Sequence, residues 1–582
     1  MTTTRSGFTK LAAVCIAILL GAVVWELGWP LTRAEHEWSR LIAAVATLGH
    51  LTGILGSYFR KEINRPSLRL LIFQIISCLM IFLLIAREQQ EAGYMRFTEL
   101  SRLVITAGLI AIPTLMSLTR IFEWLVGKQK KGRPLMAPAM QFVASLGVVI
   151  LAGTGLLLLP NSTYPGITLS FTDALFTSTS AVCVTGLNAV DFAHTFTPLG
   201  EMFTLALIQI GGFGIMTFAY FVAMVAGQGF SLRDRVLLTD LLDEDNLGAV
   251  VSFITTIVVS TLFIELCGTV LLYFSWEGKD INLMGEPLWW HSLFHSVSAF
   301  CNAGFSTFPM NLMEPGIRLC YSGQAVIMAL IVCGGLGFGI YKEINSRLAN
   351  RFFSKHRRLH MQWTPYFKLV MSSTGILLAG GALAIFAVSS PHAAEPLGEH
   401  LWICLFDSVT ARTAGFNISD YGRYLPAASL IMCGLMMVGG SPGGTAGGMR
   451  TTTCAIAGAE ILRILRGRDH VEFFRRRIDQ RTVARCVITV VVSCAWIGCF
   501  TVLICALEPS MSSLDIFFEN CSAFATVGVS RGITPDLSGP SKYLLIVNML
   551  SGRVGLFAFL IALAGTPTPR HYRYPSVKIP LT

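Results

Sequence analysis

Apolar runs long enough to cross a membrane recur along the chain, separated by short polar and charged segments. A transmembrane helix needs about 20 apolar residues, and four early runs, at about 10–31, 39–58, 67–86 and 101–120, are near this length. From about residue 138 the pattern becomes an apolar run, a shorter apolar stretch that ends in a polar turn, and a second apolar run, four times over. The pattern predicts an all-α membrane protein with four such repeats after about four extra N-terminal transmembrane helices.

The repeats divide the chain into five segments. The N-terminal extension covers 1–135, and repeats A, B, C and D cover 136–230, 231–350, 351–470 and 471–582. The polar turns end at Gly186, Gly304, Gly415 and Gly528, so that successive glycines are 118, 111 and 113 residues apart (186 to 304, 304 to 415, 415 to 528). Such a period indicates one structural unit used four times.

The polar turns have the composition expected of a pathway for a cation. Backbone carbonyls can replace the water shell of an ion if the chain turns at φ values that side chains oppose, which glycine allows. The stretches before the turns, such as 171–181 and 517–525, are too short to span and fit re-entrant helices whose carbonyl ends favour a cation. Close helix packing through small residues is the alternative for any single turn. The turn residues are Val184, Thr185, Gly186, Asn302, Ala303, Gly304, Thr413, Ala414, Gly415, Thr526, Val527 and Gly528.

A second group of glycines follows each turn, inside the next apolar run. These glycines lie at 211–214, 334–337, 439–443 and 552–555. In the third repeat, residues 439–448 are almost entirely glycine, serine, proline and threonine. A helical position costs about 1 kcal/mol for glycine and about 3 kcal/mol for proline, so the helix is expected to break here. A simple kink is the alternative.

Two arginines lie close to these glycines. Arg553 stands inside the last apolar run, and an ionisable group in such a place usually faces a cavity or a partner. A salt-bridged, purely structural arginine is the alternative. Arg412 lies three residues before Gly415, where an unpaired positive charge would oppose a cation. We therefore expect a carboxylate partner for Arg412, with Glu519 preferred over Asp407.

Composition and charge narrow the class of protein. Of the 582 residues, 53% are hydrophobic and 13% are charged, and the mean hydropathy is +0.62. The net charge of +10 does not indicate nucleic-acid binding, because the Lys and Arg residues sit in short loops between apolar runs. The fifteen cysteines show no CxxC pair or metal-ligand spacing, and we expect reduced packing residues.

The charge of the early loops predicts the orientation of the chain. Basic residues cluster at 60–69 and 120–133, whereas the alternate loops carry glutamates, although four arginines blur this pattern. The positive-inside rule then places the N-terminus, and with it the C-terminus, in the cytoplasm. The first apolar run is expected to be a retained helix rather than a signal peptide, because it is long and lacks an A-x-A site.

The turns and glycines together resemble a known family, the Trk/Ktr/HKT superfamily of potassium transporters, and especially its KtrB/TrkH-type ion-translocating subunits. The segments 179–187, 298–305, 412–416 and 522–530 are similar to the four selectivity-filter segments of that family. The segments 439–448 and 574–579 are similar to its intramembrane loop and its C-terminal tail. The resemblance covers about 138–582 and implies four M1–P–M2 repeats around a central pore, with K⁺ at the filter residues.

The resemblance also implies a gate. The family places a flexible loop below the filter, which here consists of Gly439, Gly440, Ser441, Gly443, Gly444, Thr445, Gly447 and Gly448. It puts an arginine, here Arg553, beneath the filter near this loop. At ~5 Å and an effective dielectric constant of about 20, such a charge repels a permeating cation by roughly 3 kcal/mol.

Partners and cofactors are implied in the same way. The resemblance implies a homodimer, surrounded by lipid in the cytoplasmic (inner) membrane, that docks a cytosolic RCK-type nucleotide-binding regulatory ring (KtrA/TrkA-like). A nucleotide (ATP/ADP or NAD) would enter only through that partner, and no covalent cofactor is expected. The basic segments 342–358 and 463–485 are candidate docking surfaces, with membrane topology alone as the other explanation of their charge.

Potassium uptake is therefore the expected function. Relatives that pass sodium often carry serine in place of the first filter glycine, so Gly186 favours potassium. Sodium or non-selective monovalent cation transport stays open, since selectivity depends on the fine geometry of the carbonyls. A membrane-embedded enzyme is disfavoured, because the sequence has no HExxH and no clustered nucleophile and base. A scaffold role is open for the N-terminal extension.

Overall fold

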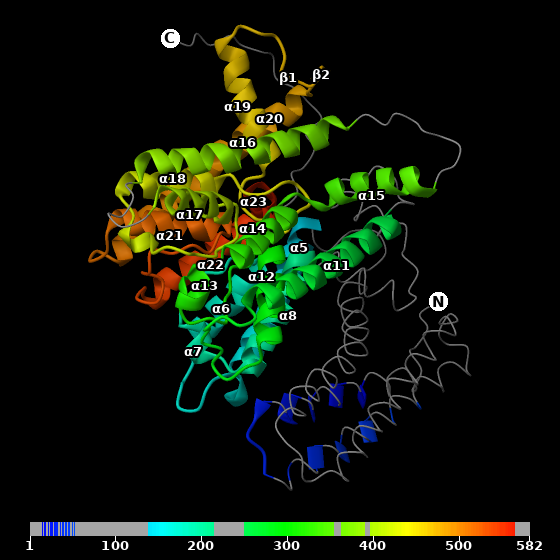
Figure 1. The fold of residues 1–582 in the computed structure, drawn as a ribbon, viewed down its shortest axis with the longest axis vertical. Coiled ribbons are helices and arrows are strands. Elements are labelled where there is room, and N and C mark those ends of the chain that lie inside the picture. The colour runs from blue at the N-terminus through cyan, green and yellow to red at the C-terminus, as the bar shows by residue number, and fades with distance from the viewer. Residues whose placement is uncertain are drawn as a thin grey trace.

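The structure is a computed structural model that describes residues 138–214, 250–353, 363–389 and 396–564, with scattered positions between 14 and 52. These residues form an almost entirely helical protein (Figure 1), with a single two-stranded hairpin in the described part. The all-α class predicted from the sequence is confirmed. Most of the predicted extension at 1–135, and the segment 574–579, lie outside the described residues.

Twelve of the described helices fall into four consecutive units, each with a first helix, a short second helix and a third helix. The first unit consists of α5 (Pro138–Leu157), α6 (Phe171–Cys183) and α8 (Pro198–Phe213). The second consists of α11 (Val250–Trp276), α12 (Leu288–Cys301) and α14 (Tyr321–Gly335). The third consists of α16 (Pro365–Val388), α17 (Leu397–Thr410) and α18 (Pro426–Met437), and the fourth of α20 (Gln480–Leu507), α21 (Ser513–Ala525) and α22 (Gly539–Val554).

The remaining elements connect or extend these units. Short helices in the connections are η1 (Pro160–Ser162), α7 (Phe192–Thr195), η2 (Asn311–Met313), α13 (Pro315–Arg318) and η3 (Tyr421–Arg423). Helices α15 (Phe338–Phe353), α19 (Thr451–Leu465) and α23 (Leu556–Ala564) follow the third helices of the second, third and fourth units. The hairpin pairs β1 (Glu472–Phe473) with β2 (Arg476–Arg477) in antiparallel register, between α19 and α20.

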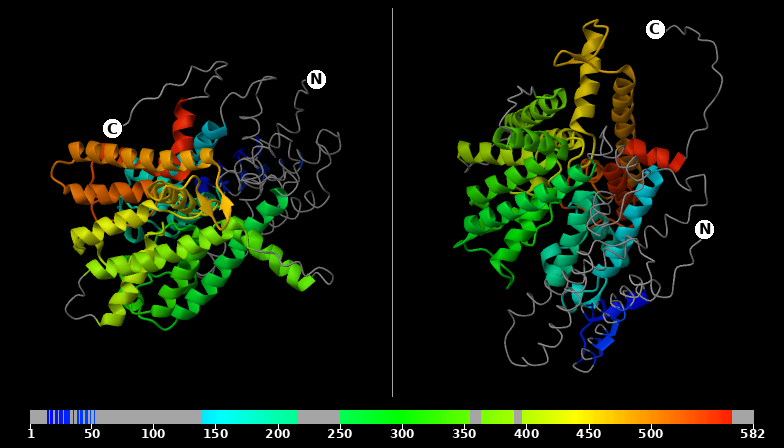
Figure 2. Two further views of the ribbon diagram at one scale, coloured as in Figure 1. Left: turned by 90° about the horizontal axis from the view of Figure 1, so that it is seen from above. Right: turned by 90° about the vertical axis from the view of Figure 1, so that its right-hand side faces the viewer.

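The first and second helices differ in length and burial, as membrane physics requires. Helices α11, α16 and α20 are long and apolar enough to cross a membrane. Leu262, Phe263 and Leu266 of α11 are more than half exposed, so this apolar face is available to lipid. The short second helices are too short to span (Figures 1 and 2); most residues of α6, α12 and α21 are buried, as is the C-terminal half of α17.

The third helices all end at the second group of glycines. Helix α18 ends at Met437 and α19 begins at Thr451, so the predicted break at 439–448 is confirmed. The chain bends by 93° between α14 and the first part of α15, where Gly337 has a φ of +87°. Gly214 and Gly555 follow α8 and α22 with φ values of +77° and +89°. The glycines therefore mark interruptions in more than the third unit.

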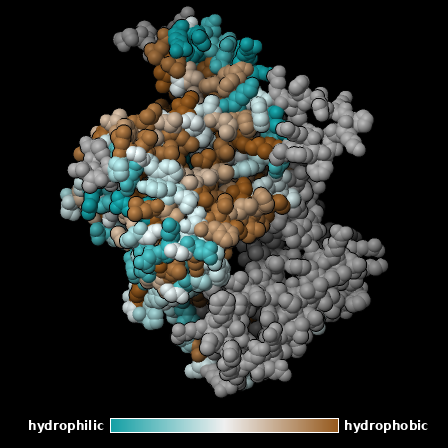
Figure 3. All heavy atoms as spheres, in the orientation of Figure 1, coloured by the Kyte–Doolittle hydropathy of each residue, from teal (hydrophilic) through white to brown (hydrophobic). Residues whose placement is uncertain are grey.

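The surface is divided by polarity. In Figure 3, hydrophobic residues gather over the middle of the visible face, and hydrophilic residues cover its top and its left. The top corresponds to α19 and the hairpin in Figure 1. Exposed apolar side chains next to polar ends are what a membrane-embedded protein shows.

Candidate functional site

The candidate site begins where each second helix ends. Val184, Asn302, Thr413 and Thr526 have φ values of +57°, +61°, +70° and +51°, a left-handed conformation that glycine normally adopts at this position. At three of the four ends, the next residue donates its N–H to a carbonyl five residues back, as Thr185 does to Ser180 at 2.7 Å. These hydrogen bonds fix the turn, because they satisfy carbonyls that the helix end leaves free.

The glycine two residues later turns the chain again. Gly186, Gly304, Gly415 and Gly528 have φ values of +91°, +69°, +81° and +92°. Helix side chains hold these turns: the Ser180 and Ser522 hydroxyls accept the N–H of Gly186 and Gly528 at 3.0 and 3.1 Å. In each turn, two residues of positive φ flank one residue of negative φ. This alternation allows successive carbonyls to point to the same side.

The four turns lie against one another in a closed ring. A Cβ on Gly186 would lie 2.4 Å from the Ala303 carbonyl oxygen, and one on Gly304 would lie 2.7 Å from that of Ala414. A Cβ on Gly415 would lie 2.7 Å from the Val527 oxygen, and one on Gly528 only 2.1 Å from the Thr185 oxygen, which closes the circle. Every glycine therefore packs against a carbonyl of the next turn, where a side chain has no room.

Oxygen atoms dominate the chemistry of this ring. The Oγ1 atoms of Thr185, Thr413 and Thr526 are buried and have no hydrogen-bond partner among the described residues. Buried polar groups normally have one. Neutral carbonyl and hydroxyl oxygens are the ligands that weakly hydrated cations accept in place of water.

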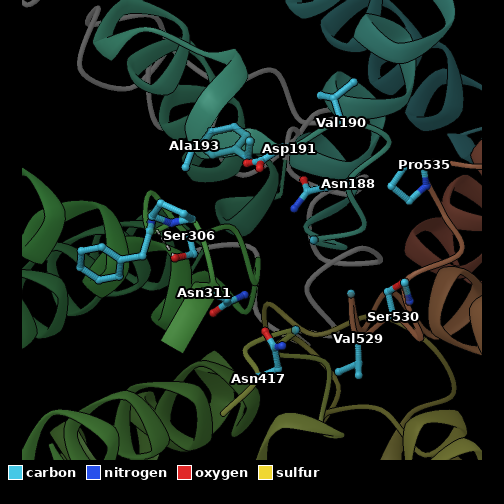
Figure 4. A pocket seen from close by; sticks show the side chains of 17 residues that line it. Asn188, Val190, Asp191, Ala193, Ser306, Asn311, Asn417, Val529, Ser530 and Pro535 are labelled. Atoms are coloured by element: carbon cyan, nitrogen blue, oxygen red, sulfur yellow. Dashed lines mark hydrogen bonds between the residues drawn. The ribbon is translucent and has the colours of Figure 1, made fainter. Parts of the chain in front are cut away.

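A cavity of about 300 Å³ lies on one side of the ring. Gly186, Gly415 and Gly528 form part of its lining. Figure 4 shows Asn188, Asn311 and Asn417 around it, which come from three different units. The amide side chains give this side of the ring a polar lining.

The glycine-rich segment 438–450 lies on the opposite side of the ring. A Cβ on Gly447 would lie 2.0 Å from Oγ1 of Thr526, at the helix end of the fourth turn. The segment is anchored to α14, since Ser441 and Thr445 donate their N–H groups to the Gly335 and Gly334 carbonyls at 2.9 and 3.3 Å. Its ends meet where Gly439 donates its N–H to the Met449 carbonyl at 2.8 Å. The segment is thus an irregular loop between α18 and α19 whose residues are mostly buried or half-buried in protein.

Arg553 joins this loop to the first unit. Its two terminal nitrogens donate to the backbone carbonyls of Thr445, in the loop, and Gly211, in α8. Within the described part of the chain, none of the ion pairs involves Arg553. The salt-bridged alternative is therefore not what the structure contains; the guanidinium bridges two carbonyls instead.

The structure contradicts the predicted ion pair between Arg412 and Glu519. Glu519 accepts hydrogen bonds from the Ser530 and Thr534 hydroxyls, at 2.5 and 2.9 Å, and from the Arg531 backbone N–H. Asp407, the second choice, accepts bonds from the Tyr421, Tyr424 and Ser419 hydroxyls. Arg412 is 7% exposed, and its Nε and Nη1 atoms have no hydrogen-bond partner among the described residues. Among the described residues neither carboxylate forms an ion pair with Arg412, and each accepts hydrogen bonds from hydroxyls of its own unit.

Arg531 is the residue that sequence reasoning missed. Its Nε donates to Asp515 at 2.6 Å, and Nη1 donates to the Tyr421 carbonyl and the Ser429 hydroxyl at 2.8 and 2.6 Å. The side chain therefore joins the fourth unit to the third, close to Ser530 at the cavity. The sequence did offer a signal: Arg531 lies three residues after Gly528, and Asp515 lies at the start of the short helix that precedes this turn.

Comparisons with known proteins place this geometry in a family. Residues 101–574 match the model of the TrkH family, described as cation transport protein. The chain is 34% identical to Ktr system potassium uptake protein B of Bacillus subtilis over 74% of this chain and 94% of that protein. It is 32% identical to potassium/sodium uptake protein NtpJ of Enterococcus hirae, over 78% of this chain and 99% of that protein.

A solved structure shares the fold. The potassium transporter TrkH from Vibrio parahaemolyticus aligns with a TM-score of 0.58 and 18% identity, over 85% of this chain and 97% of that one. At this identity the likeness concerns the fold alone. With the family match covering most of the sequence, the chain belongs to the TrkH family of cation transport proteins and is a transporter rather than an enzyme.

Proposed function

We propose that the chain takes up potassium across the cytoplasmic membrane, through a filter made of the four glycine turns. The observation that carries the proposal is the closed ring, in which each turn glycine packs against a carbonyl of the next turn. Each of the four units then acts as an M1–P–M2 repeat, with the short helix as its re-entrant element. The names of Ktr system potassium uptake protein B and of potassium transporter TrkH support the choice of ion.

The loop 438–450 and Arg553 form the gate in this proposal. The loop lies against Thr526 at the helix end of a turn, and Arg553 holds it to α8 through two carbonyls. A guanidinium on the axis of a cation pathway raises the energy of an ion beside it. Movement of the loop would carry Thr445 away from Arg553 and open the path.

Regulation by a cytosolic RCK-type ring and assembly as a homodimer belong to the same proposal. The basic segment 463–485 supports docking, because its arginines at 466, 468, 475, 476 and 477 are all exposed near the hairpin. Arg463 is different, since it pairs with Glu460 at 2.6 Å. An exposed basic hairpin at the end of α19 suits an acidic surface on a partner.

Uptake in cells tests the proposed function. The chain is expressed in a bacterial strain that lacks potassium uptake systems, with and without a co-expressed RCK partner, and growth at low potassium is measured. We expect rescue, with the partner raising the rate. Absence of rescue in both cases would contradict the proposal. Parallel flux measurements with potassium and sodium distinguish selective potassium uptake from sodium or non-selective transport. The comparison is needed because the relative NtpJ is named a potassium/sodium uptake protein.

Substitution of one turn glycine tests the filter. In Gly186→Ser, the Cβ would lie 2.4 Å from the Ala303 carbonyl oxygen, so the ring must widen or distort and the preference for potassium over sodium must fall. Gly166→Ser is a matched control, since Gly166 has nearly the same φ, +90°, but no atom within 4 Å of its Cβ position. An unchanged ion preference in Gly186→Ser would count against the filter, whereas the control is expected to keep it.

A further inference from the structure

The four units are joined by polar contacts that occupy equivalent positions. In each unit, the fourth residue of the third helix is hydrogen-bonded to a side chain of a neighbouring unit. This position lies near the start of the helix, remote from the glycines at its end. The four residues are Glu201, Gln324, Ser429 and Lys542.

Two of these contacts use an indole N–H. Trp290 of α12 donates to Glu201 of α8 at 2.7 Å, which joins the second unit to the first. Trp402 of α17 donates to Gln324 of α14 at 2.6 Å, which joins the third unit to the second. Trp290, Glu201 and Gln324 are each less than 5% exposed, whereas Trp402 is half-buried, so the first bond is shielded from water and the second is partly shielded.

The other two contacts use charged groups. Lys542 of α22 donates to Asp173 of α6 at 2.8 Å, which joins the fourth unit to the first. Between the fourth and third units, Arg531 donates to Ser429 and to Asp515, each at 2.6 Å. With these two, a polar contact stands at every junction around the ring.

The short-helix residues at these junctions also occupy equivalent positions. Asp173, Trp402 and Asp515 each lie thirteen residues before the glycine of their turn (173 to 186, 402 to 415, 515 to 528), and Asp515 is joined to Ser429 through Arg531. Trp290 lies fourteen residues before Gly304. Each contact therefore holds the start of a short helix whose other end is the turn. An α-helix of this length is a rigid rod of roughly 20 Å, so a shift at its start moves the turn.

We propose that these four contacts, which we call the junction clamps, are positioning elements that set the spacing of the four turns and hence the preference among monovalent cations. The proposal rests on the proposed function of the ring as a filter. The turns meet one another by close contact between glycines and carbonyls, which resists compression much more steeply than widening. The clamps add a directional restraint against widening, because each one ties a short helix to a neighbouring unit.

The test compares ion preference in variants that break single clamps. Trp402→Phe keeps the aromatic ring and removes the N–H bonded to Gln324, and Lys542→Met keeps the stem and removes the charge bonded to Asp173. Uptake of potassium, rubidium and sodium is measured in membranes from the same preparation, so that the ratio does not depend on the amount of protein. We expect the ratio of potassium to sodium uptake to fall about tenfold, which corresponds to about 1.4 kcal/mol.

A charge exchange separates a positioning role from a folding defect. Asp173→Lys and Lys542→Asp each break the clamp, and the two together restore an ion pair at the same place. We expect the double variant to recover much of the wild-type ratio. Ratios equal to the wild-type value in Trp402→Phe, Lys542→Met and both single exchange variants would overturn the proposal, even if the amount of folded protein fell.

Trp496→Phe is the matched control. Trp496 of α20 donates to Asn548 of α22 at 2.9 Å, so it makes the same kind of bond inside one unit rather than between two. We expect its ratio to equal that of the wild type. A fall as large as that of Trp402→Phe would overturn the role of the junctions. If the wild-type chain shows no potassium uptake, the proposed function itself fails, which these ratios distinguish from failure of the clamps alone.

Discussion

At the scale of single residues, the ring depends on backbone angles that most side chains oppose. Val184, Thr413 and Thr526 are β-branched and nevertheless have φ values between +51° and +70°. A left-handed residue costs roughly 1–2 kcal/mol for an L-amino acid, so the surroundings must hold it. Here the hydrogen bonds at the helix ends and the packing of the ring hold it. Strain of this kind often coincides with functional sites.

A double-mutant cycle tests the corrected environment of Arg412. Glu519 is bonded to Ser530 and Thr534 rather than to Arg412, so the effects of Arg412→Met and Glu519→Gln on the free energy of unfolding should add to within about 0.5 kcal/mol. Thermal unfolding in detergent provides the measurement. The pair Arg531 and Asp515, whose atoms are 2.6 Å apart, is the positive control and should show coupling. Strong coupling between 412 and 519 would contradict the structure.

The sequence predicts a single-residue feature when the residue type itself marks it, and not when it depends on contacts between distant parts of the chain. Gly186 and its three counterparts were identifiable because a residue without a side chain marks a backbone constraint wherever it repeats. The left-handed conformation of Val184 was not, since nothing in a valine indicates it. The surroundings of Arg412 could not be predicted from closeness to the turns in the sequence, because hydroxyls of their own units satisfy both candidate carboxylates. The junction clamps join residues as far apart as 173 and 542 and leave no local pattern.

At the scale of elements, the glycine-rich loop combines weak internal structure with specific anchors. Few of its residues have a side chain that could pack, and glycine favours no single conformation. It is held by hydrogen bonds to α14 and Arg553, and it lies against Thr526. The sequence predicted the break in the helix from composition alone. It could not predict the anchors, because Gly334, Gly335 and Arg553 lie in other units and contribute through backbone or long-range contacts.

Two substitutions of Arg553 distinguish a charge barrier from a tether. Arg553→Gln removes the positive charge, and we expect potassium uptake to rise, by up to about a hundredfold if a barrier of roughly 3 kcal/mol governs the rate. Arg553→Lys keeps the charge but lacks the fork that bridges the Thr445 and Gly211 carbonyls. If charge alone matters, the lysine variant stays slow. If the tether matters, both variants become faster.

Flux in membrane vesicles gives the measurement for Arg553. Arg463→Gln is the control, because it removes an arginine paired with Glu460 in α19, away from the ring, and should leave basal flux unchanged. Equal flux in the wild type, Arg553→Gln and Arg553→Lys would exclude both roles for this residue.

At the scale of the whole molecule, the ring makes stability and ion binding one problem. Four turns from segments more than 100 residues apart must close on one another, each against a carbonyl of the next. In the proposed filter these carbonyls face a common axis, where their dipoles repel one another in the absence of a cation. A cation bound there would attract all four sets of carbonyls and so favour closure. Ion occupancy should therefore stabilise the complete fold rather than one unit.

Thermal unfolding in different salts tests this link between ion binding and fold. A ligand that binds only the folded state stabilises it by RT ln(1 + [L]/Kd), about 2.7 kcal/mol at 100 times Kd. We expect a higher melting temperature of the detergent-solubilised chain in potassium chloride than in choline chloride at equal ionic strength, with sodium chloride between them. Gly186→Ser should lose the difference, since its Cβ disturbs the ring, whereas Gly166→Ser should keep it. Equal melting temperatures in potassium and choline for the wild type would mean that the ring does not bind the ion, because choline is too large to enter it and any stabilisation by ionic strength is the same in both salts.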